Sequence, residues 1–340
     1  MRRFSSAQFL FQALLISCVV NIVASGAASA SEQPVLDMLV KMQSALQQLN
    51  YHGTLVYSQD GQIQSMRVVH KADQAGEVER LISLNGSARE VVRNNDVVTC
   101  YLPDSKSVLV GERQFKGNVL SQLAENDFAQ LQGFYQFQLE SVDRVAGLEA
   151  QAILIKPKDG FRYGYRLWLD RENGLLLKSD MLDEQGKVLE QAMFADVAIV
   201  DFIPQAMLEP VSAAEGYRKF EHDGPDDDDN IVESRWQIAA LPKGFTVKAR
   251  FRHHMPASDS LAEHWVISDG LASISVYIEN MAQDQAAFEG ASKTGAFNAF
   301  GAVADNHQVT VIGEVPAKAV ETVASSVSLK PAGESSSSGQ

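Results

Sequence analysis

The sequence predicts an α+β protein, mostly antiparallel β, with a large N-terminal half-open β-barrel and a smaller C-terminal sheet domain. Three observations support this fold class. Asp-Gly and Asn-Gly pairs, which are preferred in tight hairpin turns, recur at 60–61, 85–86, 159–160 and 173–174. Residues 161–170 alternate apolar with basic or aromatic side chains, which is the two-residue period of a strand. Helical periodicity is limited to a few segments between the strands.

Residues 1–30 have the features of a secretory signal peptide. Arg2 and Arg3 precede an apolar run from Phe9 to Val23, and Ala28-Ser29-Ala30 supplies the small residues of a cleavage site. The apolar run is shorter than the roughly 20 residues that a membrane-spanning helix needs. We therefore expect export to the periplasm and cleavage before Ser31.

Leu15-Ile16-Ser17-Cys18 resembles a lipobox, the motif at which bacterial lipoproteins are cut and acylated on cysteine. Apolar residues continue past Cys18 to Val23, whereas a lipobox normally closes its apolar core. The preferred interpretation is a cysteine inside the signal core. Lipid anchoring through Cys18 is the alternative.

The large domain is expected at 31–205 and begins with a helix. Apolar residues recur at helical spacing between Pro34 and Leu49, so one helix face packs against a core. Short strands follow from Tyr51 to about Val200 and predict a meandering antiparallel sheet. Apolar spacing between Asn118 and Gln132 predicts helical turns, which we place on the concave side of the curved sheet. A curved sheet that holds helices is an open barrel with an apolar interior.

Residues 206–230 are expected to form a linker that contains the acidic run Asp226–Asp229. Like charges in a row repel one another and keep the backbone in water. Metal binding by these aspartates is the alternative, but the alternating spacing and closing glutamate of a calcium loop are missing.

The small domain is expected at 231–330. Strands are predicted near Trp236, at 245–251, at 264–268 and at 271–279, and Asp269-Gly270 turns the last two into a hairpin. After a further strand at 308–312, Pro316 opens a helix with an apolar stripe. The serine-rich segment 331–340 is expected to be disordered.

Motifs for catalysis are missing from the sequence. There is no Gly-x-Ser-x-Gly elbow, no His-Glu-x-x-His helix, no cysteine pair and no phosphate-binding glycine loop. Cys100 lies in an apolar run and is expected in the core. A formal net charge of −14 argues against nucleic acid as a partner. The sequence therefore predicts a binding protein that needs no cofactor or metal and is not an enzyme.

Several segments resemble the periplasmic sigma-E regulatory proteins of the MucB/RseB family. The likeness covers nearly the whole chain after residue 30 and keeps the segment order. The segments that carry it are Gly86–Arg93, Asp159–Asp170, Leu241–Phe245, Ser268–Leu271 and Val311–Pro316.

The resemblance implies a lipoprotein-carrier-like half-open barrel with a small sheet domain beside it. It also implies a function in regulating the envelope-stress sigma factor and, with it, alginate. The protein would bind the periplasmic domain of a membrane anti-sigma factor, shield it from regulated proteolysis, and be displaced by lipid or lipopolysaccharide. A lipid or lipoprotein carrier is the main alternative, and a hydrolase would need a triad that only the fold could assemble. A homo-oligomer is left open.

Two groups of side chains are candidate binding residues. Arg162, Arg166 and Trp168 are expected on one face of a strand, where arginines could pair with lipid phosphate or an acidic peptide. The alternative is that this face is the plain outer side of a sheet. Aromatic and basic residues after the linker could hold the partner peptide, although core packing explains the two aromatic ones equally well: Trp236, Phe245, Arg250 and Arg252.

Overall fold

The computed structural model describes residues 27–112, 127–210, 216–222, 233–254, 261–281 and 286–331. The apolar run of the expected signal peptide, with Cys18, lies outside these ranges, as do the acidic run at 226–229 and most of the serine-rich end. No helix in the described part of the chain is long and apolar enough to cross a membrane.

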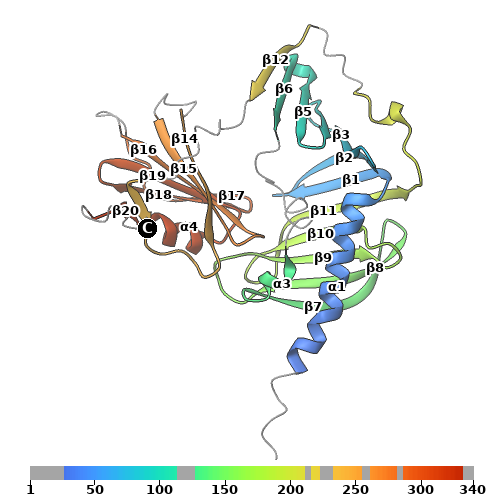
Figure 1. Cartoon of the computed structure of the whole chain (residues 1–340), viewed down its shortest axis with the longest axis horizontal. Coiled ribbons are helices and arrows are strands. Elements are labelled where there is room, and N and C mark those ends of the chain that lie inside the picture. Colours follow the sequence, from blue (N-terminus) through green and yellow to red (C-terminus); the bar gives the residue numbers. More distant parts are fainter. Residues whose placement is uncertain are drawn as a thin grey trace, which may run out of the picture.

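The large domain is a single sheet that curves without closing on itself (Figure 1). Its strands are β1 Tyr51–Gln59, β2 Gln62–Asp73, β3 Gly76–Ser83, β4 Glu90–Asn94, β5 Val97–Leu102, β6 Ser107–Glu112, β7 Tyr135–Val145, β8 Leu148–Pro157, β9 Gly164–Asp170, β10 Leu176–Leu182, β11 Val188–Ile199 and β12 Arg218–His222. Within the described residues they are ordered β12-β6-β5-β4-β3-β2-β1-β11-β10-β9-β8-β7. The predicted half-open antiparallel barrel is therefore confirmed.

Turn chemistry sets the register of the first hairpin. Asp60 and Gly61, between β1 and β2, have φ angles of 51° and 74°. A two-residue type I′ turn needs positive φ at both positions, which Asp and Gly tolerate. The paired strands therefore place Tyr51 opposite His70 and Tyr57 opposite Gln64.

Helix α1, Ala27–Gln48, packs along the sheet, as the apolar spacing predicts (Figure 1). Its side chains Val35, Leu39 and Met42 are almost fully buried in a core with Tyr165 and Leu167 of β9. Short helix α3, Phe128–Leu131, joins the same core, and Asp127 caps its N-terminus by accepting a hydrogen bond from the Ala129 amide at 3.0 Å. The rest of the helical segment expected at 118–132 precedes residue 127 and lies outside the described residues.

The strand expected at 161–170 begins only at Gly164. Within β9 the predicted alternation is confirmed, because Tyr165, Leu167 and Leu169 enter the α1 core while Trp168 enters a second cluster. Both faces of this strand are covered for most of its length, so its basic-aromatic side is not freely exposed.

Part of the expected linker at 206–230 belongs to the large domain. The short 3-10 helix η2, Gln205–Met207, packs against the sheet, and the Met207 carbonyl accepts a hydrogen bond from Arg80 Nη1 at 2.9 Å. Strand β12 pairs in parallel with β6. The linker prediction was wrong at these positions, because buried Leu208 and the backbone of β12 gain contacts that a solvated chain would lack.

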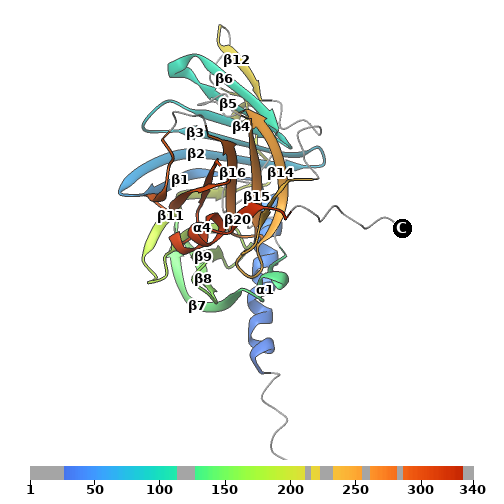
Figure 2. The same cartoon turned by 90° about the vertical axis from the view of Figure 1, so that its left-hand side faces the viewer.

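The small domain is an antiparallel sheet with one helix. Its elements are β13 Trp236–Ile238, β14 Thr246–His254, β15 Leu261–Ser268, β16 Ser273–Asn280, β17 Gly290–Thr294, β18 Phe297–Ala304, β19 His307–Gly313, α4 Ala317–Ala324 and β20 Val327–Leu329. The sheet order over the described residues is β14-β15-β16-β19-β18-β17, and β13 pairs with β20. The predicted β15–β16 hairpin and the helix after Pro316 are confirmed. Figure 1 shows this sheet, orange to red, beside the large one, and Figure 2 shows it facing the viewer, in front of the large sheet.

The two domains meet at Arg162, whose side chain is fully buried. Its Nε lies 2.9 Å from Oδ2 of Asp269, in the small domain, and its Nη1 lies 2.8 Å from Oδ2 of Asp159. Nη2 donates a hydrogen bond to the Lys243 carbonyl at 2.7 Å. A buried guanidinium is tolerated only when its charge is neutralised, and here two carboxylates and two hydrogen bonds, from Nη1 and Nη2, compensate it.

Aromatic rings complete the surroundings of this cation. The guanidinium carbon lies 5.2 Å, 5.5 Å and 4.9 Å from the ring centres of Phe134, Tyr135 and Phe245. The Tyr135 hydroxyl also donates a hydrogen bond to Asp269 Oδ2 at 3.1 Å. Arg162, Asp269 and these partners are hereafter called the domain joint.

Gly244 is required beside the joint for two reasons. Its φ of +90° is a conformation that residues with a side chain rarely adopt. A Cβ atom at this position would also lie only 2.5 Å from the Phe134 ring. The glycine therefore lets the Lys243 carbonyl reach Arg162 while the chain passes close to the large domain.

Asp269→Ala is expected to lower the free energy of unfolding by about 3 kcal/mol, because it removes one charge from a buried ion pair. Urea denaturation followed by tryptophan fluorescence measures this change. The matched control is Glu149→Ala, which breaks the exposed 2.8 Å pair with Arg171 and should cost less than about 1 kcal/mol. An equal, small effect of both substitutions would show that the joint does not stabilise the fold.

Candidate functional site

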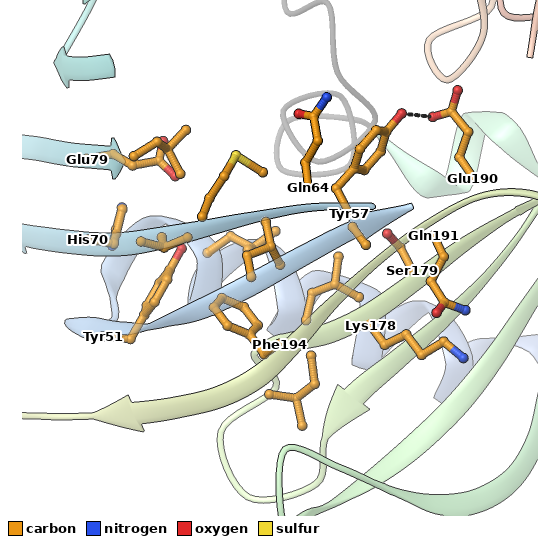
Figure 3. Close-up of a pocket in the computed structure, with 18 of the residues that line it drawn as sticks. Tyr51, Tyr57, Gln64, His70, Glu79, Lys178, Ser179, Glu190, Gln191 and Phe194 are labelled. Atoms are coloured by element: carbon orange, nitrogen blue, oxygen red, sulfur yellow. Dashed lines mark hydrogen bonds between the residues drawn. The ribbon is translucent and has the colours of Figure 1, made fainter. Parts of the chain in front are cut away.

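The curved sheet surrounds a cavity of about 460 Å³ on its concave side. Strands β1, β2, β3, β10 and β11 supply most of its walls, and the end of α1 lies against it. Figure 3 shows side chains from these strands converging on the cavity. Its volume lies within the range of roughly 300–1,000 Å³ that is typical of small-molecule sites.

The floor of the cavity is apolar and aromatic. Tyr51 lies edge-on to Phe194, with ring centres 6.0 Å apart, and stacks on His70 at 4.9 Å. The Tyr51 and Phe194 rings belong to a buried cluster that also contains Val68 and Leu177. Burial raises the pKa of Tyr51, so its phenol stays protonated. A surface of this kind binds hydrocarbon better than it binds ions.

A polar group lies at the other end of the cavity, around Glu190 (Figure 3). The Tyr57 hydroxyl donates a hydrogen bond to Glu190 Oε2 at 2.7 Å, and the Gln59 amide donates to Oε1. Burial and this hydrogen bond to the carboxylate raise the pKa of Tyr57. Glu190 is therefore held in place by two neutral donors.

Glu314 brings the small domain to the same cavity. It follows β19 and is half-buried, with the Glu190 carboxylate of the large domain as its charged neighbour. Burial, and then repulsion from Glu190, raise the pKa of Glu314 to about 7. The cavity is thus lined by both domains, and its polar end carries two carboxylates.

Another wall of the cavity carries basic and acidic groups that neutralise each other. Arg93 lies 2.8 Å from Glu77 and 3.3 Å from Glu79, and all three residues line the cavity. Arg89 also lines it and is exposed. The His70 ring bonds to the Leu49 carbonyl at 2.8 Å. This wall can meet a charged head group at the mouth while the floor meets hydrocarbon.

The lining of the cavity combines apolar side chains with a few polar groups. Two of its hydroxyl-bearing side chains, Tyr51 and Tyr57, have raised pKa values, which makes them poor nucleophiles. No group of three or more His, Cys, Asp or Glu side chains in the described part of the chain could hold a metal ion. Cys100 is half-buried rather than in the core as expected, and burial raises the pKa of its thiol.

The structure separates the first group of predicted binding residues. Arg162 precedes the strand and is enclosed in the domain joint, because Asp159 and Asp269 neutralise it there. Arg166 pairs with Glu140, with Nε 2.6 Å from Oε2. Trp168 is buried under Lys178, whose Nζ lies 4.0 Å from the ring centre. These three side chains do not form one open face, and a binding role for them stays a prediction.

The second group lies in the small domain. Trp236 and Phe245 are core residues of its sheet, and Phe245 also covers Arg162. The Arg250 guanidinium lies 4.2 Å from the Trp265 ring centre. Arg252 is partly exposed and lies 3.1 Å from Glu263. The structure brings Phe245 to the domain boundary but does not gather the four residues into one site, so their partner contacts also stay a prediction.

Sequence reasoning did not single out the residues that surround the cavity. Tyr51, Leu55 and Tyr57 share one face of β1, and this alternation was the available signal. Nothing local indicated that Glu190 and Glu314, which are far apart in sequence, would meet. Only the packing of the two domains brings them together.

Each of the two domains of the chain matches a known protein domain. Residues 34–212 match the MucB/RseB N-terminal domain, and residues 230–328 match the MucB/RseB C-terminal domain. The chain is 28% identical to "Sigma-E factor regulatory protein RseB" of Haemophilus influenzae, over 92% of this chain and 96% of that protein. It is 29% identical to "Sigma factor AlgU regulatory protein MucB" of Pseudomonas aeruginosa, over 92% of this chain and 95% of that one.

Solved structures of similar proteins share the fold. A crystal structure of MucB in complex with MucA(peri) is 29% identical, with a TM-score of 0.69 over 87% of this chain and 99% of that one. The MucA/MucB complex of Pseudomonas aeruginosa gives 28% identity and a TM-score of 0.71, over 88% of this chain and 100% of that one.

The burial of Glu314, together with repulsion from Glu190, predicts that ionisation of Glu314 destabilises the folded protein. Glu314 has a raised pKa when folded, so its stabilising contribution is complete below its ordinary value of 4.5 and is lost as the pH rises through about 7. Glu314→Gln should therefore raise the free energy of unfolding at pH 8 by about 1–2 kcal/mol, after allowance for partial exposure. Denaturant unfolding at pH 4.5 and pH 8 measures the difference.

Glu321→Gln, on the exposed side of α4, is the matched control and should change neither value. A gain for Glu314→Gln that is the same at both pH values would contradict the proposed titration.

Proposed function

Because the chain belongs to the MucB/RseB family, we propose that it is a periplasmic negative regulator of an envelope-stress sigma factor. It binds the periplasmic domain of a membrane anti-sigma factor and shields that domain from regulated proteolysis. Lipid or lipopolysaccharide that enters the cavity releases the partner. The single observation that carries the partner assignment is the complex of a similar protein, MucB, with MucA(peri).

The family assignment supports the regulatory function over the whole length of the chain. Both domains match, in the same order, and the relatives are named as sigma-factor regulators. A partner in the periplasm also agrees with the expected signal peptide, which would place the protein where that partner is exposed. A regulator of this kind needs no catalytic group.

The cavity supports a lipid as the releasing signal. Its floor is hydrocarbon and aromatic, its far end is polar, and its volume of about 460 Å³ suits part of an amphiphile. Because Glu314 of the small domain is one of the lining residues, an occupant contacts both domains. A lipid can therefore favour one arrangement of the domains over another.

Release requires that lipid and partner bind the protein with unequal preference for its conformations. A ligand shifts such an equilibrium only by its differential affinity for the two states. Moving the balance from 1:99 to 99:1 needs roughly 10⁴-fold selectivity. The shared lining of the cavity gives the lipid contacts from which such selectivity can arise.

A lipid or lipoprotein carrier is the less favoured function. A carrier would also use the apolar cavity, but the full-length relatives are named as sigma-factor regulators. The two functions differ in outcome, because a carrier passes lipid to an acceptor whereas a regulator gives up its protein partner.

A protease-protection assay tests the proposal directly. The purified anti-sigma periplasmic domain should be cleaved several-fold more slowly when this protein is present in excess over its Kd, because binding hides the cleavage site. Adding lipopolysaccharide should restore the rate. Unchanged cleavage with this protein present would overturn the function.

Filling the cavity should separate protection from release. Ala192 lies in the middle of β11 and lines the cavity, so Ala192→Trp is expected to block lipid entry. This variant should still protect the anti-sigma domain, but at least about tenfold more lipopolysaccharide should be needed to restore cleavage. The control is Ala198→Trp on the same strand, at an exposed position, which should respond as the unaltered protein does.

A further inference from the structure

The segment 89–93 contributes to the cavity wall and also to the surface beyond it. Arg89, Val91 and Arg93 alternate with Glu90 along β4 and the residue before it. Glu90 faces the other side of the sheet, where its Oε1 lies 2.6 Å from Nε of buried Arg80. Arg89 and Arg93 instead line the cavity. Val91 lies between them on the same face, so that face continues beyond the cavity wall.

Strand register extends this face to the edge of the sheet. Val91 pairs with Cys100 of β5, Cys100 with Leu109 of β6, and Leu109 with Phe220 of β12. Directly paired residues point to the same side of a sheet. On the inner side, Val91 pairs with Leu81, which lines the cavity. We call the row Val91, Cys100, Leu109 and Phe220 the concave shelf.

The concave shelf is apolar and open to solvent. Leu109 and Phe220 expose 43% and 47% of their surface, and Val91 and Cys100 are half-buried. The row spans three inter-strand spacings, about 14 Å. It carries no hydrogen-bonding side chain except the weakly polar thiol, so it offers little to a peptide backbone and suits a hydrocarbon chain.

Cations flank the shelf at both ends. Arg89 is exposed where the shelf meets the cavity. Arg218 is exposed at the outer edge, and its guanidinium carbon lies 5.8 Å from the Phe220 ring centre. Two exposed arginines beside an apolar row in a chain of net charge −14 favour an anionic head group such as a phosphate.

We propose that the concave shelf binds one acyl chain of a phosphate-bearing lipid with two or more chains, while another chain of the same molecule occupies the cavity. The phosphate lies with Arg89, between the two chains, and Arg218 holds a second anionic group at the sheet edge. The proposal rests on the proposed lipid response of the cavity and adds that a one-chain amphiphile satisfies only half of the site.

Substitution on the two faces of the sheet tests this assignment. Dioctanoyl phosphatidic acid, with two chains, and octyl phosphate, with one, serve as probes for calorimetric binding to the full protein. Leu109→Asp should weaken dioctanoyl phosphatidic acid at least about tenfold and leave octyl phosphate unchanged. The matched control is Val97→Asp, because Val97 is 47% exposed on the neighbouring strand but faces the other side.

The assigned contacts between the two arginines and the lipid head group are tested by calorimetric binding as well. Arg89→Ala combined with Arg218→Ala should weaken dioctanoyl phosphatidic acid about tenfold but leave dioctanoyl phosphatidylcholine, which has no net charge, within about twofold. The control is Arg67→Ala, an exposed arginine of β2 that faces away from the cavity. Equal loss for both lipids would overturn the assignment of the head group.

The alkylation rate of Cys100 measures whether the shelf is occupied in the unaltered protein. Dioctanoyl phosphatidic acid should slow its alkylation by N-ethylmaleimide several-fold, measured on the peptide that contains Cys100, and octyl phosphate should not. Phosphatidic acid that binds the unaltered protein but neither protects Cys100 nor binds Leu109→Asp more weakly would show that the shelf is not a lipid site. The proposed lipid response of the cavity would then still stand.

Two further outcomes would also overturn the shelf. If phosphatidic acid fails to bind the unaltered protein, the proposed lipid release fails with it, whereas partner protection is judged separately by the protease assay. Alternatively, Leu109→Asp could weaken the anti-sigma domain and leave lipid binding unchanged, which would assign the shelf to the protein partner.

Discussion

The buried ion pair between Arg162 and Asp269 links the two domains. A guanidinium taken out of water is costly unless charge and hydrogen-bond acceptors surround it. Here the acceptors come from both domains, because Asp159 lies in the large domain and Asp269 and the Lys243 carbonyl lie in the small one. The observed relative position of the domains therefore neutralises this cation.

That position makes the cavity a shared site. With the joint closed, Leu271 and Ala296 of the small domain enter the α1 core, and Asn298 donates a hydrogen bond to the Tyr163 hydroxyl at 2.9 Å. Glu314 then reaches the cavity lining near Glu190. A ligand in the cavity and a change in domain position act on the same contacts, which is the physical condition for coupling between them.

The segments that resemble the family gather at these places. Asp159–Arg162, Leu241–Phe245 and Ser268–Leu271 meet at the joint, and Val311–Pro316 carries Glu314 to the cavity. Gly86–Arg93 forms the cavity wall that leads onto the concave shelf. Segments that look unrelated along the chain are thus parts of one arrangement, which links the position of the domains to what the concave side holds.

Many of the elements could be predicted from the sequence, because hairpin turns, strand alternation and helix spacing are local. The sequence predicted the half-open barrel, the β15–β16 hairpin and the helix after Pro316, and the family likeness supplied the function. Three other features depend on the tertiary structure. It buried Arg162 in the joint, paired β12 with β6 where a linker was expected, and brought Glu314 to Glu190. These outcomes depend on contacts between residues far apart in sequence, whose burial and charge balance no local pattern records.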